Sequence, residues 1–153
     1  MSLTNNVQIN LSSNLTGSVG LATLSASVSQ SISSRLDTVA CDSLFSVTGT
    51  ISGGAVSYDL VGSLTDPLGD AVTFAKVMAV FFRNNGDNAM TVGGANNVPI
   101  FANTSDLLNV AADAYNLYID PTGVAVTGTN DDIITVTGTN DDTYDLIVIG
   151  SST

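Results

Sequence analysis

Hydrophobic and polar residues alternate in short runs along most of this chain, and Gly, Pro, Asn and Asp separate the runs. From Leu44 the alternation is clean, with Phe45, Val47 and Ile51 on one face, followed by Gly53-Gly54. A period of two bounded by turn residues is typical of β-strands with one buried face. We therefore predict that strands on either side of Gly53-Gly54, up to residue 60, form a hairpin.

The apolar run from Val77 to Phe82 suits a strand that is buried on both faces. Asn84-Asn85-Gly86-Asp87 follows it directly. Asn-Gly between two apolar runs favours a type I′ turn, because both central residues must adopt positive φ. We therefore expect residues 77–83 to pair with residues 88–92 as a second hairpin.

The remaining chain predicts more short strands, and the last of them suits burial from both sides. These strands are expected at 98–101, 107–111, 115–119 and 144–149, with turns at 64–70 and at Asp120-Pro121. About ten short strands with frequent turns indicate an all-β fold, a single-domain β-sandwich of jelly-roll type with antiparallel strands. A β-solenoid is the second possibility.

The N-terminal segment is polar and rich in Ser and Asn, with one brief alternation at Val7, Ile9 and Leu11. We expect residues 1–18 to form a polar arm that pairs with a neighbouring subunit, and residues 19–153 to form the sandwich domain. The stretch 19–36 fits both a helical stripe and a period of two. The serines between its apolar residues favour a strand.

Composition points away from catalysis. All 14 acidic residues are aspartates, and the chain has no glutamate, histidine or tryptophan. Glutamate favours helices, so its absence agrees with the β pattern. Without histidine, Ser-His-Asp and Cys-His arrangements are excluded, and no catalytic residue is expected. Carboxylate-pair hydrolysis remains formally possible, but the sugar-stacking aromatic residues that such sites need are few and spread out.

The charge balance limits the partners. The net charge is −11, and the only basic residues are Arg35, Lys76 and Arg83. Nucleic acids and anionic membranes bind basic patches, so neither is an expected partner. No secretory signal or membrane-length apolar run is evident, which predicts synthesis and use without export. The single Cys41 is expected to be a small buried hydrophobe.

One heptapeptide occurs twice, as residues 126–132 and 136–142. Its aspartates, Asp131, Asp132, Asp141 and Asp142, are candidate calcium ligands, because calcium prefers carboxylate and carbonyl oxygens. If a strand at 132–137 separates the two turns, they lie about 15 to 20 Å apart and cannot share one ion. The favoured interpretation is two turns whose aspartates cap backbone amides, so no cofactor is expected and calcium is the alternative.

Residues 59–80, the following Val92-Gly93-Gly94 and residues 143–150 resemble a family of small tailed-bacteriophage proteins encoded among the virion structural genes. The resemblance implies a capsid decoration, or cement, protein made in the host cytoplasm. Its partners would be the major capsid protein, on the outer capsid surface of the virion, and further copies of itself in a dimer or trimer. The resemblance supplies no functional residues. The alternatives are a tail or neck protein and a calcium- or glycan-binding adhesion module.

Overall fold

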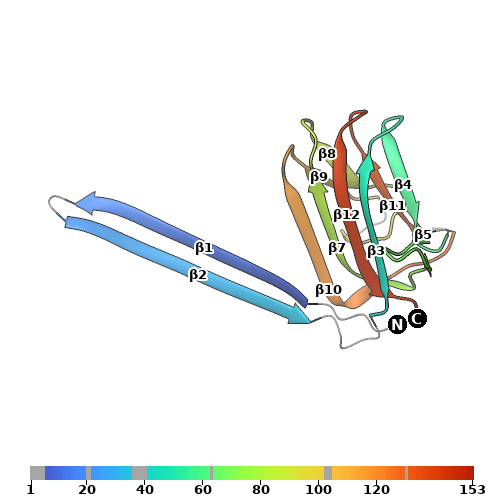
Figure 1. The fold of residues 1–153 in the computed structure, drawn as a ribbon, viewed down its shortest axis with the longest axis horizontal. Coiled ribbons are helices and arrows are strands. Elements are labelled where there is room, and N and C mark those ends of the chain that lie inside the picture. The colour runs from blue at the N-terminus through green and yellow to red at the C-terminus, as the bar shows by residue number, and fades with distance from the viewer. Residues whose placement is uncertain (1–5, 20–21, 36–40, 63, 102–104, 130) are drawn as a thin grey trace.

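The computed structural model describes residues 6–19, 22–35, 41–62, 64–101, 105–129 and 131–153. The described residues contain strands and no helix. A body, residues 41–153, packs two four-stranded sheets against each other, and a long two-stranded ribbon projects from it (Figure 1). The predicted all-β sandwich is therefore confirmed, and the arrangement is not a solenoid.

The first sheet has the strand order β10-β7-β12-β3, and the second has the order β4-β11-β8-β9. All pairings within both sheets are antiparallel. The first sheet contains β3 (Ser43–Thr50), β7 (Lys76–Asn84), β10 (Tyr115–Ala125) and β12 (Thr143–Ser151). The second contains β4 (Ala55–Asp59), β8 (Met90–Gly93), β9 (Leu107–Val110) and β11 (Ile133–Thr137). Two short strands, β5 (Leu64–Thr65) and β6 (Ala71–Val72), pair around the turn predicted at 64–70.

Both predicted hairpins are wrong, because their turns carry the chain from one sheet to the other. After Asn84 the chain leaves the first sheet and enters β8 of the second, and after Gly53-Gly54 it passes from β3 to β4. Asn85 and Gly86 do not have the positive φ that a type I′ turn requires. The buried Asn84 side chain fixes this connection instead, by donating to the carbonyls of Val110 and Ala111.

Two smaller expectations also differ from the structure. Residues 98–101 form no strand, and only Asn97 next to them makes an isolated bridge, to Ile133. Asp120-Pro121 does not end its strand. It lies in an irregularity of β10, where the register with β7 shifts between Ile119 and Val124. A bulge tolerates proline because it needs no ladder hydrogen bond at that position.

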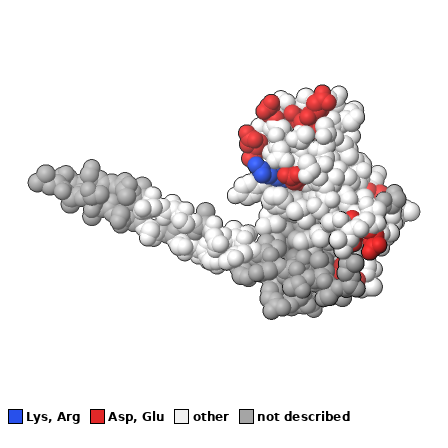
Figure 2. Space-filling model, viewed as in Figure 1, with Lys and Arg blue, Asp and Glu red and all other residues white. Residues whose placement is uncertain are grey.

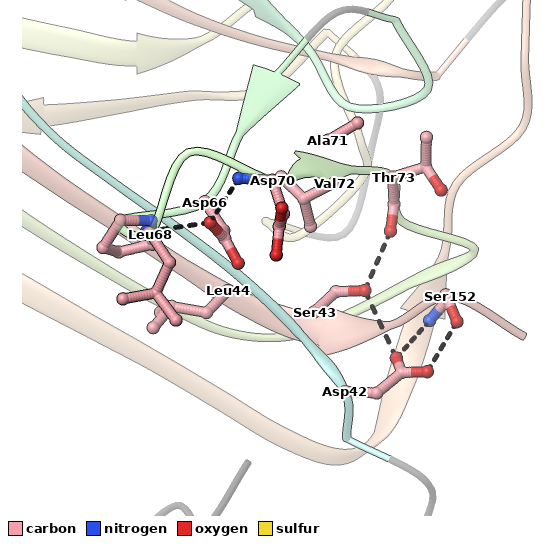
Figure 3. A pocket seen from close by; sticks show the side chains of 11 residues that line it. Asp42, Ser43, Leu44, Asp66, Leu68, Asp70, Ala71, Val72, Thr73 and Ser152 are labelled. Atoms are coloured by element: carbon pink, nitrogen blue, oxygen red, sulfur yellow. Dashed lines mark hydrogen bonds between the residues drawn. The ribbon is translucent and has the colours of Figure 1, made fainter. Parts of the chain in front are cut away.

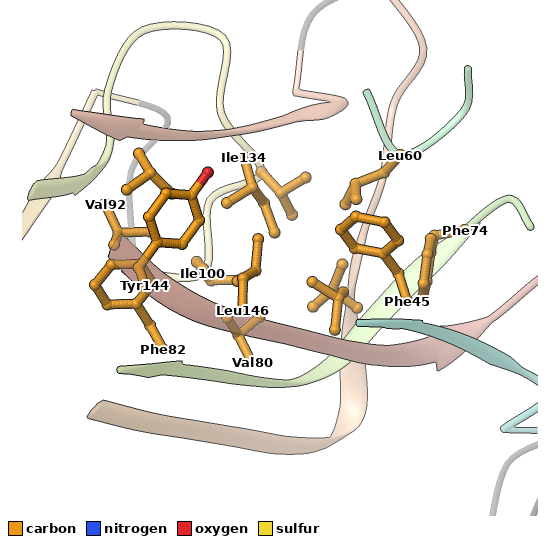
Figure 4. Close-up of a cluster of buried hydrophobic side chains, with 14 of the residues drawn as sticks. Phe45, Leu60, Phe74, Val80, Phe82, Val92, Ile100, Ile134, Tyr144 and Leu146 are labelled. Atoms are coloured by element: carbon orange, nitrogen blue, oxygen red, sulfur yellow. The ribbon is translucent and has the colours of Figure 1, made fainter. Parts of the chain in front are cut away.

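The core lies between the two sheets and is almost entirely apolar (Figure 4). Tyr144, Leu146 and Val148 alternate along the inner side of β12 and are fully buried. The Tyr144 ring stacks on Phe82 with centroids 5.6 Å apart, and its hydroxyl lies 2.7 Å from that of Tyr58 on the opposite sheet. A hydroxyl buried in such a core requires a partner, and Tyr58 supplies it.

The ribbon consists of β1 (Asn6–Val19) and β2 (Ala22–Arg35), which pair antiparallel along their whole length. The segment 19–36, for which a strand was favoured over a helix, is therefore a strand over Ala22–Arg35. The domain boundary expected after residue 18 falls inside the ribbon, because residues 22–35 pair with the arm and not with the sandwich. The described body begins at Cys41.

Candidate functional site

The ribbon has one apolar and one polar face. In an antiparallel pair, residues opposite each other project to the same side, and the side alternates along each strand. Ile9 pairs with Ile32, and the neighbouring Asn10 pairs with Ser31. The same register assigns ten apolar residues to the Ile9 face and none to the other. The ten are Val7, Ile9, Leu11, Leu15, Val19, Ala22, Leu24, Ala26, Val28 and Ile32.

The polar face of the ribbon holds Ser, Thr, Asn, Gln and a single charge, Arg35. Its described side chains are exposed, and Ser31 Oγ donates to Asn10 Oδ1 at 2.7 Å. This bond agrees with the register, since both residues project to the same side. Such a face suits water, and the opposite face does not.

No sheet of the body covers the apolar face of the ribbon in Figure 1. Ile9 on this face is 40% exposed. An isolated two-stranded hairpin is at best marginally stable in water. A ribbon with one apolar face therefore needs a surface to pack against.

A second apolar surface lies on the body, on the side of the β10-β7-β12-β3 sheet that faces away from the core, and Cys41 packs against one part of it. We call it the open face. Its apolar residues are Leu44, Ala79, Phe81, Leu117, Ile119, Ile147 and Ile149, with Tyr115 at one end. Apart from the buried Ala79 and the exposed Tyr115, these residues are half-buried. The sequence predicted β7 and β12 to be buried on both sides, and this is wrong for Phe81 and Ile147.

The outward side of the β4-β11-β8-β9 sheet is mainly polar by contrast. Its strands present Ser57, Thr135, Thr91 and Asn109 in cross-strand positions, and Ser57 Oγ hydrogen-bonds Thr135 Oγ1 at 3.0 Å. Two large apolar residues lie on this side, Leu107, which is 60% exposed, and the half-buried Ile133. The two sides of the sandwich therefore differ, and the open face is the one that resembles an interface.

Aspartates gather at the turns of the body, as Figure 2 shows at its upper end. Asp87, Asp113, Asp141 and Asp142 follow the strand ends there, and Arg83 is the basic residue of this end. The ribbon joins the body at the opposite end, where β3 begins (Figure 1). These four aspartates and the ribbon therefore lie apart.

The turns of the two heptapeptides lie at opposite ends of β11, which meets the condition under which they cannot share one ion. Asp132 accepts a hydrogen bond from Thr129 N at 2.8 Å, and Asp142 accepts one from Asn88 Nδ2 at 3.1 Å. Asp131 and Asp141 have positive φ, of 102° and 72°, at the tips of the turns. These roles are the capping and turn roles of aspartate.

Among the described residues, no group of three or more Asp or Cys side chains has an arrangement that could hold a metal ion. The structure does not bring the candidate aspartates of the two turns together. Calcium binding by a single turn stays a prediction.

A pocket of about 530 Å³ opens at the lower end of the body, between the start of β3 and the β5–β6 turn (Figure 3). Three carboxylates line it, those of Asp42, Asp66 and Asp70. Asp42 accepts hydrogen bonds from Ser152 N and Ser152 Oγ at 2.7 and 2.6 Å, and these bonds hold the pKa of its carboxyl below the usual value. Asp66 Oδ1 accepts from the amides of Leu68 and Asp70. Asp66 therefore stabilises the β5–β6 turn, and Asp42 holds Ser152. These structural roles account for the presence of both carboxylates in the pocket.

Sequence reasoning missed the apolar face of the ribbon and the open face of the body. The signal for the ribbon was present, because the alternation of Val7, Ile9 and Leu11 continues across residue 18 at Val19. Its register with residues 22–35 could not be derived from the pattern alone. Cys41 is buried against Met78 and Ala79, as expected for a small hydrophobe.

No protein family profile matches the chain, and no curated protein or solved structure matches it either. Within the described residues, the structure has no helix with the length and apolarity to cross a membrane.

Proposed function

We propose that this protein is a non-enzymatic structural protein of a tailed-phage virion, a decoration protein that binds the outer surface of the capsid and stabilises the shell. The observation that carries the proposal is the open face. Phe81, Leu117 and Ile147 form its apolar centre, and Ser46 and Arg83 lie at its polar edge. An apolar centre with a polar rim is the usual anatomy of a protein interface.

The strand order supports the same proposal through the fold. Eight strands in two sheets, with most connections crossing between the sheets, fit the connectivity of a jelly roll. Jelly rolls occur in viral capsid proteins and also in lectins and cupins, so this support is an analogy at the level of the fold. The likeness of residues 59–80 and 143–150 to virion structural proteins favours the capsid among these uses.

The net charge also supports the proposal, because it favours a partner surface with basic groups. With a net charge of −11, the chain repels nucleic acid and anionic lipid, and it is attracted to a basic protein surface. The aspartates at the turns form the rim of such a contact, while the open face supplies its apolar centre.

Binding of the purified chain to capsids assembled without it tests the proposal. We expect the wild type to sediment with the shells, and Leu117→Asp on the open face to bind at least about tenfold more weakly, because the contact would bury an unpaired charge. Leu107→Asp makes the same change on the other sheet, where Leu107 is exposed, and should bind like the wild type. Cryo-electron microscopy of the virion then locates the chain. A chain found only in the tail, or absent from the particle, would overturn the proposal.

A further inference from the structure

We propose that copies of this chain associate through their ribbons, with the apolar face of one ribbon packed against the apolar face of another. The partner is a second copy of the same chain, and the contact surface is the ten-residue apolar face defined above. This inference does not rest on the capsid function. It follows from the ribbon alone and holds for any structural role of the chain.

The two-faced pattern of the ribbon requires a partner along its whole length. The register places large apolar residues toward both ends of this face: Ile9 pairs with Ile32 toward the body, and Leu15 and Leu24 have positions toward the tip. Two such faces packed at the usual sheet spacing of about 10 Å would form a small two-layer β-structure with polar outer sides. The Asn10 side of each ribbon would then remain in water.

Charge favours the ribbon, and not the body, as the contact between copies. Residues 6–35 contain no acidic residue and a single basic one, Arg35. Thirteen of the 14 aspartates lie in residues 41–153. Two bodies therefore repel each other, whereas two ribbons do not. An uncharged, one-sided apolar element on a strongly acidic chain is suited to self-association.

The size of the face sets a further condition. Strands of 14 residues span about 46 Å, and two strands are about 10 Å wide, so two faces together offer roughly 900 Å² in projection. Stable interfaces bury about 1,200 Å² or more of accessible surface, which is larger than the projection because side chains are corrugated. The ribbons must therefore overlap along most of their length, or more than two of them must pack together.

Light scattering on the full-length chain during size exclusion tests the proposal. We expect the wild type to have a mass that is a multiple of the 15.6 kDa monomer. Ile9→Asp places a charge on the apolar face and should weaken association by at least about 100-fold, which shifts the chain to the monomer. The matched control is Asn10→Asp. It adds the same charge one residue further on the opposite face, and its carboxylate can still accept from Ser31 Oγ, so the mass should not change.

Three outcomes would overturn the inference. They are a monomeric wild type, an Ile9→Asp variant whose mass does not change, and equal dissociation by Asn10→Asp. Leu117→Asp distinguishes packing of ribbon on ribbon from packing of the ribbon on the open face of another copy. Loss of the oligomer in this variant would mean that the ribbon packs on the open face, and it would also overturn the inference. Near-ultraviolet circular dichroism of the body tyrosines checks folding. If Ile9→Asp does not fold, Ile9→Ser replaces it, with Asn10→Ser as its control.

Discussion

Tyr144 on β12 and Tyr58 on β4 share a hydrogen bond of 2.7 Å between their hydroxyls, and this bond joins the two sheets across the core. Tyr144 is fully buried, whereas Tyr58 is half-buried. Burial, followed by the bond to Tyr58, raises the pKa of the Tyr144 hydroxyl. The buried Tyr144 hydroxyl therefore needs Tyr58 as its hydrogen-bond partner more than the half-buried Tyr58 hydroxyl needs Tyr144.

This inequality predicts different costs for removing each hydroxyl. Tyr144→Phe leaves the Tyr58 hydroxyl able to bond water, and we expect a loss of about 0.5–1.5 kcal/mol in the free energy of unfolding. Tyr58→Phe leaves the buried Tyr144 hydroxyl without a partner, so we expect a loss of about 1–3 kcal/mol. Urea denaturation measures both. The double variant should be less destabilised than the sum, and a sum that is strictly additive would contradict the shared bond.

The sequence Thr-Gly-Thr occurs three times in the body, at 48–50, 127–129 and 137–139. We expect replacement of its glycine by alanine to change the free energy of unfolding differently at each position. A methyl group at Gly49 would overlap the ring of Tyr144, so Gly49→Ala should cost about 1–3 kcal/mol. At Gly138 the methyl would lie 3.0 Å from Met90 Cγ, a flexible neighbour, and the cost should be smaller. At Gly128 the nearest atom would be 3.9 Å away, and the change should stay within about 0.5 kcal/mol. Equal unfolding midpoints for the three variants in urea would refute this ranking.

The positions of strands were largely predictable from the sequence, but their partners were not. The period of two located β4 and β12 because inward residues such as Tyr144 and Leu146 must be apolar. A turn such as Asn85-Gly86 can join two strands of one sheet or cross between two sheets. The choice depends on Asn84, whose side chain reaches carbonyls 26 residues further along the chain. Local sequence does not contain that contact.

The same limit applies to the candidate interaction surfaces. Alternation at Val7, Ile9 and Leu11 was visible, and so was the serine-rich alternation that follows. Only the register, with Ile9 opposite Ile32, shows that the apolar positions of both strands share a face. The open face was concealed for a related reason. Apolar outward residues such as Ile147 look like core residues until the structure shows that they are half-buried on the outer side of the sheet.

The Asn84 side chain predicts a strong effect of a nearly isosteric substitution. Its Nδ2 donates to the carbonyls of Asn88, Val110 and Ala111 at 2.8, 3.1 and 3.0 Å. In Asn84→Asp a carboxylate oxygen would replace Nδ2 and face these carbonyls, and we expect a loss of about 3–5 kcal/mol at neutral pH. Burial raises the pKa of such a carboxyl, so the loss should shrink as the pH falls. Asn109→Asp, at an exposed position, is the control, and a loss that does not depend on pH would argue against a buried charge.

Asp145 predicts how the body responds to acid. Its carboxylate accepts hydrogen bonds from Asn85 Nδ2 at 2.9 Å and Thr48 Oγ1 at 2.7 Å, and these bonds, with the charge of Arg83, lower its pKa below 3.8. Because the folded pKa lies below the unfolded value, the stabilisation is present above pH 3.8 and is lost as the pH falls through the folded pKa. Asp145→Asn should therefore lower the Tm at neutral pH. The loss in the free energy of unfolding should stay below about 1 kcal/mol, because this group is partly exposed.

The difference in Tm between Asp145→Asn and the wild type should then shrink as the pH falls through the folded pKa of Asp145, because below that pKa both carry a neutral group at this position. Thermal unfolding followed by circular dichroism from neutral to acidic pH measures it. Asp87→Asn removes the same charge from an exposed turn at the same end of the body, and it corrects for the general effect of net charge. A Tm difference that stays constant over the whole range would mean that Asp145 contributes through packing, and its carboxylate would not be the source of the stabilisation.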